Sequence, residues 1–75
     1  MKITMAEFEE FEKEFLFLVI AHPTYRLGQA FLNKFPKIQT SMIEDGDLGA
    51  KQEYRIWSSN NREEVLDLLA WYIER

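Results

Sequence analysis

The chain has 75 residues, of which 47% are hydrophobic and 15% aromatic, and its nine basic and thirteen acidic residues give a net charge of −4. A chain of this length forms one domain, residues 1–75, and its many aromatic side chains can fill a compact core. The negative charge disfavours direct binding to nucleic acid, which requires a basic surface. The chain has no cysteine, which excludes disulfides and thiolate chemistry.

No stretch reaches the roughly 18 apolar residues that are needed to cross a bilayer. Residues 15–21 are apolar throughout, but five glutamates precede them, whereas a secretory signal peptide begins with positive charge. We therefore expect no membrane association and a cytoplasmic location.

Residues 4–21 have the pattern of an amphipathic helix. Thr4 and Glu7 have the spacing of a capping box, in which each side chain bonds to the backbone NH of the other residue. Residues 15–20 are apolar on every side of this helix, so its end is either enclosed by other helices or in contact with another chain. Apolar residues recur at helical spacing at Met5, Phe8, Phe11, Phe15, Leu18 and Val19.

Pro23 is expected to end this first helix, because it forces His22 out of the helical conformation. Thr24 is then a suitable N-cap for a second helix over residues 25–35. Gly28 destabilises a helix by about 0.5–1 kcal/mol relative to alanine. Its presence therefore indicates either close helix packing, with the first helix as the favoured partner, or the close approach of another group to the backbone.

Two structures fit residues 36–57. In the favoured one, Pro36 lies in the first turn of a short helix, and Gly46 follows its C-terminus. In the alternative, residues 38–43 and 53–57 form a small β-hairpin. The middle segment 38–57 is thus expected to be irregular, with a short hairpin as the second interpretation.

A final helix is predicted over residues 61–74. Asn60 has the position of its N-cap, and Glu63 and Glu64 suit the positive end of the helix dipole. Trp71 lies off the apolar stripe and is expected at the surface. The sequence therefore predicts a mostly α fold, a small three- to four-helix domain with an irregular middle segment.

No combination of residues indicates catalysis. His22 is the single histidine, and neither an acid–base partner nor a nucleophile is spaced to act with it. The acidic stretch 44–47 resembles the start of a calcium loop, but Gly46 is not at the EF-hand position and no glutamate closes a twelve-residue loop. We therefore expect no enzyme, no metal site and no cofactor.

Polar and aromatic residues offer the best candidates for recognition. Arg26, Gln29 and Asn33 share one stripe of the second helix, where they face solvent, bond to the middle segment or meet a partner. The acidic stretch 44–47 is one internal partner for the arginine. Interfaces favour Trp, Tyr and Arg as hot spots. The candidate interaction or structural network consists of Tyr25, Arg26, Gln29, Asn33, Trp57 and Trp71.

A short motif in this region resembles one in small uncharacterised proteins encoded by bacteriophages and prophages. In those proteins the motif follows an acidic first helix and precedes an apolar segment with a tryptophan, as it does here. The chain departs from them at residues 53–57, where they often carry an Asp-Pro-Phe-Tyr-like segment. The resemblance implies a phage accessory protein, many of which bind a host protein, and it implies no known activity. The matching residues are Pro23, Arg26, Gly28, Gln29, Ala30 and Asn33.

Three functions are consistent with the sequence. The favoured one is a small acidic helical module that binds another protein through its aromatic and apolar surface. The first alternative is an acidic mimic of nucleic acid that inhibits a DNA- or RNA-binding host enzyme through the glutamates of residues 7–14. The second alternative is a homo-oligomeric structural protein assembled through residues 15–20.

Overall fold

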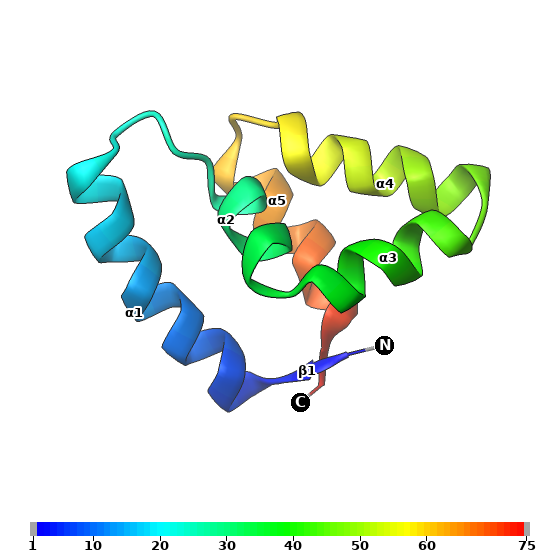
Figure 1. Cartoon of the computed structure of the whole chain (residues 1–75), viewed down its shortest axis with the longest axis horizontal. Helices are drawn as coiled ribbons and strands as arrows, with labels where there is room; N and C mark the ends of the chain where they lie inside the picture. Colours follow the sequence, from blue (N-terminus) through cyan, green and yellow to red (C-terminus); the bar gives the residue numbers. More distant parts are fainter. Residues whose placement is uncertain (1, 75) are drawn as a thin grey trace.

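Five α-helices account for most of residues 2–74, the part of the chain that the computed structural model describes. Figure 1 shows α2 near the centre, with α1 on one side and the α3–α4 pair on the other. The predicted mostly α fold is confirmed, with five helices in the described residues instead of three or four. The elements are β1 (Ile3–Thr4), α1 (Met5–Ala21), α2 (Leu27–Lys34), α3 (Pro36–Glu44), α4 (Asp47–Ser58), α5 (Arg62–Leu69), the 3₁₀-helix η1 (Ala70–Tyr72) and β2 (Ile73–Glu74).

Helix α1 begins as the sequence predicts. The Glu7 backbone NH donates to Thr4 Oγ1 at 3.1 Å, and the Thr4 backbone NH donates to Glu7 Oε1 at 3.0 Å, so the capping box is complete. Phe8, Phe11 and Phe15 are buried on one side of the helix. Their spacing of three and four residues places them on one face, which α1 turns toward the core.

An aromatic cluster joins α1 to α2. The ring centroids of Phe11 and Phe31 lie 5.5 Å apart in an edge-to-face arrangement, and those of Phe31 and Phe35 lie 5.0 Å apart. Such pairs add about 0.5–1.5 kcal/mol each to the gain from burial. The buried apolar residues are Ile3, Phe8, Phe11, Phe15, Leu27, Ala30, Phe31, Leu32, Ile38, Met42, Ile56, Val65, Leu69 and Ile73.

Helix α2 begins at Leu27, two residues later than predicted, and Arg26 instead of Thr24 is its N-cap. The chain before it forms a turn, closed by a backbone hydrogen bond of 2.9 Å from Tyr25 N to His22 O. Because this turn includes Thr24, the threonine cannot also begin the helix.

Gly28 brings α2 against α4. A Cβ atom added at this glycine would overlap the carbonyl oxygen of Ile56, so any larger residue would push the two helices apart. The predicted close packing at Gly28 is therefore confirmed, but the expected partner is wrong, since the contact is with α4 and not with α1.

The favoured prediction for the middle segment is confirmed in its first part. Pro36 lies in the first turn of α3, where its missing NH group needs no partner. Ile38 and Met42 are the buried residues of this helix, so they lie on the face that packs against the core. Gly46 follows α3 with a φ of +86°, a left-handed conformation that glycine adopts most readily.

The β-hairpin alternative is wrong, and so is the expectation of an irregular middle segment, because residues 36–44 form α3 and residues 47–58 form α4. The buried residues of this helix are Gly49 and Ile56, whereas Leu48 is exposed. An added Cβ atom at Gly49 would overlap the carbonyl oxygen of Met42, so this glycine lets α3 and α4 cross closely. A helix with so small an inner face gives no clear apolar period in the sequence.

Helix α5 is shorter than the predicted final helix. Its N-cap is Asn61, one residue after the predicted Asn60, and Asn61 Oδ1 accepts a hydrogen bond from the Glu64 NH at 3.2 Å. The α-helix ends at Leu69, five residues before the predicted end. The chain continues as η1, in which Trp71 is exposed as predicted.

The last described residues leave the helix to form β2. This strand pairs in parallel with β1, and Ile73 lies opposite Ile3. Both isoleucines are buried, and Figure 1 shows β1 beside the last described residues of the chain. A helix continued to residue 74 would lose this pairing and the burial of Ile73.

The hydroxyl group of Tyr72 joins η1 to α4. It donates a hydrogen bond to Gln52 Oε1 at 3.2 Å. Burial, and to a lesser extent the negative charge of Asp45, raise the pKa of Tyr72 above its ordinary value of 10.0. Both effects favour the neutral phenol, which is the form that can donate this hydrogen bond.

The packing at Gly28 predicts a large effect of one added methyl group. We expect Gly28→Ala to lower the free energy of unfolding by at least about 2 kcal/mol, because overpacking outweighs the better helix propensity of alanine. Urea unfolding measures the change. The matched control is Gln29→Ala on the same helix, for which we expect a change within about 0.5 kcal/mol. Equal stability of wild type and Gly28→Ala would refute the contact with Ile56.

The pKa of Tyr72 predicts a loss of stability at alkaline pH. The folded protein holds the Tyr72 proton more tightly than the unfolded chain, so this stabilisation is complete below about pH 10 and is lost as the pH rises through the folded pKa. We expect the free energy of unfolding to fall more steeply above about pH 10 in the wild type than in Tyr72→Phe. Tyr54→Phe controls for the loss of a tyrosine hydroxyl; parallel curves for wild type and Tyr72→Phe would contradict the expectation.

Candidate functional site

The polar residues predicted to form a network around α2 are only partly brought together. Asn33 Nδ2 donates a hydrogen bond to the Tyr25 hydroxyl at 2.9 Å, which ties α2 to the turn before it. Arg26 and Gln29 are half-buried, and neither side chain has a hydrogen-bond or ion-pair partner within the described part of the chain. The suggested ion pair between Arg26 and the acidic stretch 44–47 is therefore not formed.

The two tryptophans have different environments. Trp57 is half-buried and packs against the core. Trp71 is 72% exposed and borders a groove between α4, the end of α5 and η1, whose lining also includes Leu48, Leu68 and Tyr72. The groove formed by Leu48, Leu68 and Trp71 is one candidate surface for a partner.

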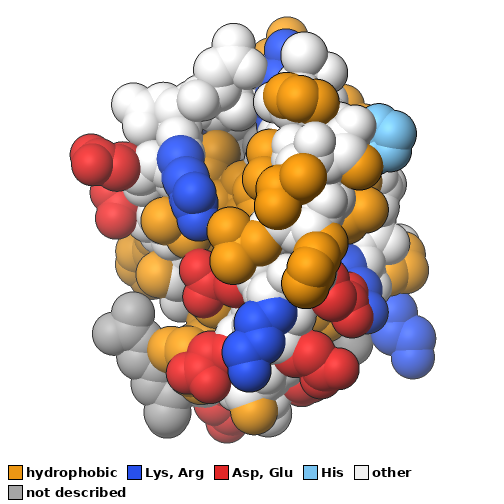
Figure 2. All heavy atoms as spheres, turned by 90° about the vertical axis from the view of Figure 1, so that its left-hand side faces the viewer, with side chains coloured by type: hydrophobic (Ala, Val, Ile, Leu, Met, Phe, Trp, Pro, Cys, Tyr) orange, Lys and Arg blue, Asp and Glu red, His pale blue; other side chains and the backbone are white. Residues whose placement is uncertain are grey.

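A second candidate surface lies on the side of α1 that faces away from the core. Leu16, Phe17 and Ile20 are 53%, 76% and 77% exposed, respectively. We call these three residues the α1 outer face. Figure 2 shows hydrophobic side chains gathered on the upper half of this side and charged side chains on its lower half. Enclosure by other helices, one of the two interpretations of residues 15–20, is thus wrong for the α1 outer face.

The acidic half of α1 carries the net charge of the protein. Helix α1 contains five glutamates and one lysine, a net charge of −4 that equals the charge of the whole chain. Glu14 pairs with Lys34 at 3.0 Å, and Glu7 belongs to the capping box. Glu9 and Glu10 are exposed and have no ion-pair partner within residues 2–74. Exposed Lys13 lies one turn before Leu16 and Phe17, and Glu9 and Glu10 lie one turn further toward the start of α1.

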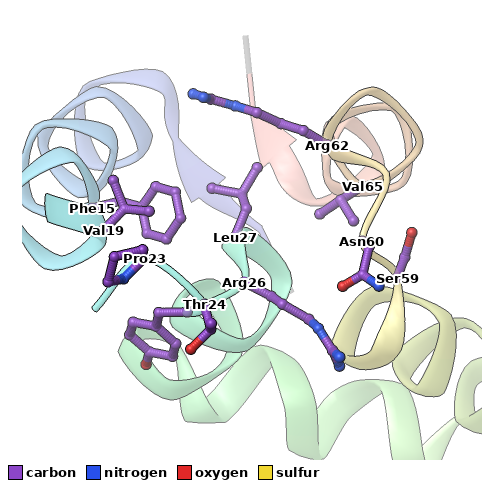
Figure 3. A pocket seen from close by; sticks show the side chains of 11 residues that line it. Phe15, Val19, Pro23, Thr24, Arg26, Leu27, Ser59, Asn60, Arg62 and Val65 are labelled. Atoms are coloured by element: carbon purple, nitrogen blue, oxygen red, sulfur yellow. The ribbon is translucent and has the colours of Figure 1, made fainter. Parts of the chain in front are cut away.

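A cavity of about 430 Å³ lies between α1, the start of α2 and the start of α5. Phe15, Leu27 and Val65 form part of its apolar wall, and Figure 3 shows Arg26 and Arg62 on either side of them. The sequence identified Arg26 as a candidate but missed Arg62. The only feature of Arg62 in the sequence is that it follows the N-cap of α5, and this does not show that α5 packs beside α2.

The groups that could bind a metal ion are dispersed over the described residues. Among residues 2–74, no group of three His, Cys, Asp or Glu side chains is arranged to hold a metal ion. His22 is exposed at the end of α1. No helix within the same residues is long and apolar enough to span a membrane.

No family model matches the chain, and no curated protein or solved structure matches it either. Its function must therefore be inferred from the surfaces that its own residues form.

Proposed function

We propose that this protein is an interaction module that binds another protein through the α1 outer face. The supporting observation is the exposure of three large apolar side chains, Leu16, Phe17 and Ile20, side by side on one helix. Full burial of such a side chain by a partner would contribute about 1.5–3 kcal/mol to the free energy of binding. A cluster of this kind on a small protein is typical of a surface that another molecule covers.

The fold does not require the α1 outer face. The opposite side of the helix already supplies the core with Phe8, Phe11 and Phe15. Leu16, Phe17 and Ile20 contribute apolar area that remains in water, so a need for core packing does not explain them. Binding of a partner would explain why these three exposed residues are apolar.

The neighbouring charge indicates the character of the partner. Glu9 and Glu10 lie on α1 two turns before the α1 outer face, and neither has an ion-pair partner among the described residues. A complementary protein would offer an apolar groove for the helix, with lysine or arginine at one end. A phage accessory protein acting on a bacterial host protein in the cytoplasm, as the motif of α2 implies, would fit this mode of binding.

A second copy of the chain is the alternative occupant of the same face. In an antiparallel pair of α1 helices centred on Phe17, the acidic halves of the two copies would lie at opposite ends and would not repel each other strongly. The apolar residues of the two helices would meet in the middle, as a twofold interface requires. This geometry supports a homodimer as the second candidate function.

We expect Phe17→Ser to abolish capture of the partner from a lysate of the host. The loss of this anchor should weaken binding at least tenfold, which corresponds to about 1.4 kcal/mol. Trp71→Ser is the matched control, because it removes an equally exposed aromatic residue from the other apolar surface. A partner that is retained by Phe17→Ser and lost by Trp71→Ser would move the binding site to the groove of Trp71.

Charge neutralisation separates protein binding from mimicry of nucleic acid. If the apolar face carries the binding, the double variant Glu9→Gln, Glu10→Gln should bind somewhat more slowly but retain most of its affinity. Loss of binding in this variant, with retention in Phe17→Ser, would instead support the acidic mimic.

The homodimer has its own test. We expect sedimentation equilibrium to give a dimer for the wild type and a monomer for Phe17→Glu if a second copy covers the α1 outer face. A monomer in both cases would leave the face to a different protein. Circular dichroism should show the same helix content in both, because Phe17 is exposed.

A further inference from the structure

The cavity between α1, α2 and α5 combines an apolar wall with two cations. Phe15, Leu27 and Val65 are buried residues that line it, and its volume of about 430 Å³ is within the usual range for binding sites. None of the residues that line the cavity is acidic, although the chain as a whole is. We infer that this cavity binds an acidic peptide segment of a partner protein, with an apolar side chain held between two carboxylates.

The positions of the two arginines support this inference. Arg26 is the N-cap of α2 and Arg62 is the first residue of α5, so two separate helices hold them. Figure 3 shows their side chains extending in opposite directions on either side of Leu27. Neither group has a hydrogen-bond or ion-pair partner among the described residues, whereas Arg55 is paired with Glu64 at 3.0 Å.

Separated arginines favour carboxylates over a phosphate group. A phosphorylated side chain carries almost two negative charges, which several converging cations bind best. Here the two arginines that line the cavity extend in opposite directions, so each guanidinium group matches a separate carboxylate in a bidentate pair. The buried wall between Arg26 and Arg62 then requires an apolar group between the two acids.

The remaining polar side chains of the cavity suit a peptide backbone. Thr24 and Asn60 line it and have no hydrogen-bond partner within residues 2–74. Ser59 Oγ already accepts a hydrogen bond from the Asn61 NH at 3.1 Å, which fixes the loop beside it. Thr24 and Asn60 can therefore donate to, or accept from, the amide groups of an extended peptide.

A second copy of this chain does not provide such a segment. The chain has Glu-Phe-Glu twice, at residues 7–9 and 10–12, but Phe8 and Phe11 are buried in the core. In its Glu-Val-Leu-Asp sequence, residues 64–67, Val65 is buried and Glu64 is paired with Arg55. The peptide must therefore come from a different protein. In this respect the inference rests on the proposed function, since the occupant is part of a protein partner.

The test uses short synthetic peptides and the full chain. The probes are fluorescein-labelled, C-terminally amidated peptides with the cores Glu-Leu-Glu and Glu-Leu-Leu-Glu, and fluorescence anisotropy measures their Kd. We expect at least one of them to bind, and replacement of either Glu by Gln, or of Leu by Ser, to raise the Kd about tenfold. The same peptide should shift the NMR signals of Val19, Leu27 and Val65.

Arginine variants locate the binding. We expect Arg26→Gln and Arg62→Gln each to raise the Kd about tenfold, because each removes one bidentate pair. Arg55→Gln is the matched control: it changes the net charge equally, lies outside the cavity and should change the Kd less than about twofold. Circular dichroism checks that each variant keeps its helix content.

Failure of this inference is distinguishable from failure of the proposed function. Absence of binding at millimolar concentration of both peptides, or an equal loss in Arg55→Gln, would overturn the peptide site. Phe17→Ser should leave the peptide affinity unchanged, since Phe17 does not line the cavity. If Phe17→Ser had no effect on capture while the arginine variants lost the peptide, the proposed function of the α1 outer face would be refuted. The proposed peptide site in the cavity would then still be supported.

Discussion

The fold depends on the contact between Gly28 and the backbone of Ile56. Because the glycine has no side chain, α2 lies directly against α4, and there is no room for a larger residue. This brings α2 to the centre of the protein, where it contacts all four other α-helices. The eight residues of α2 include five buried ones. A helix this short is marginal alone, so its stability comes from these contacts.

The central position of α2 also determines what the other helices expose. Helix α1 packs mainly against α2 and the two strands, and no further helix covers its other side. Its side chains therefore divide between an inner face in the core and an outer face in water. The turn before α2 places Arg26 beside α5, which creates the cavity with Arg62. The motif from Pro23 to Asn33 is thus a structural corner that positions two surfaces.

The sequence predicts elements whose signals lie within one turn of the chain. It fails for elements whose limits depend on packing against distant parts of the chain. The capping box of Thr4 and the proline of α3 act within one turn, so both were predicted correctly. Helix α4 was missed because its inner face depends on a glycine that fits against α3, which no periodicity reveals. The end of α5 was misplaced because Ile73 pairs with Ile3, 70 residues away. Arg62 was missed for the same reason, since only the packing of α5 beside α2 brings it to the cavity.

The all-round apolar character of residues 15–20 follows from two roles of one helix end. Phe15 and Val19 face inward and line the cavity, whereas Phe17 and Ile20 face outward into water. A helix that only closed the cavity would need apolar residues on one side, and charged residues would serve on the other, as they do in its first half. Under the proposed function, the change from charged to apolar residues on the outer side is where a partner would replace water. A partner that covered the outer face and placed an acidic segment in the cavity would hold the same helix end from both sides.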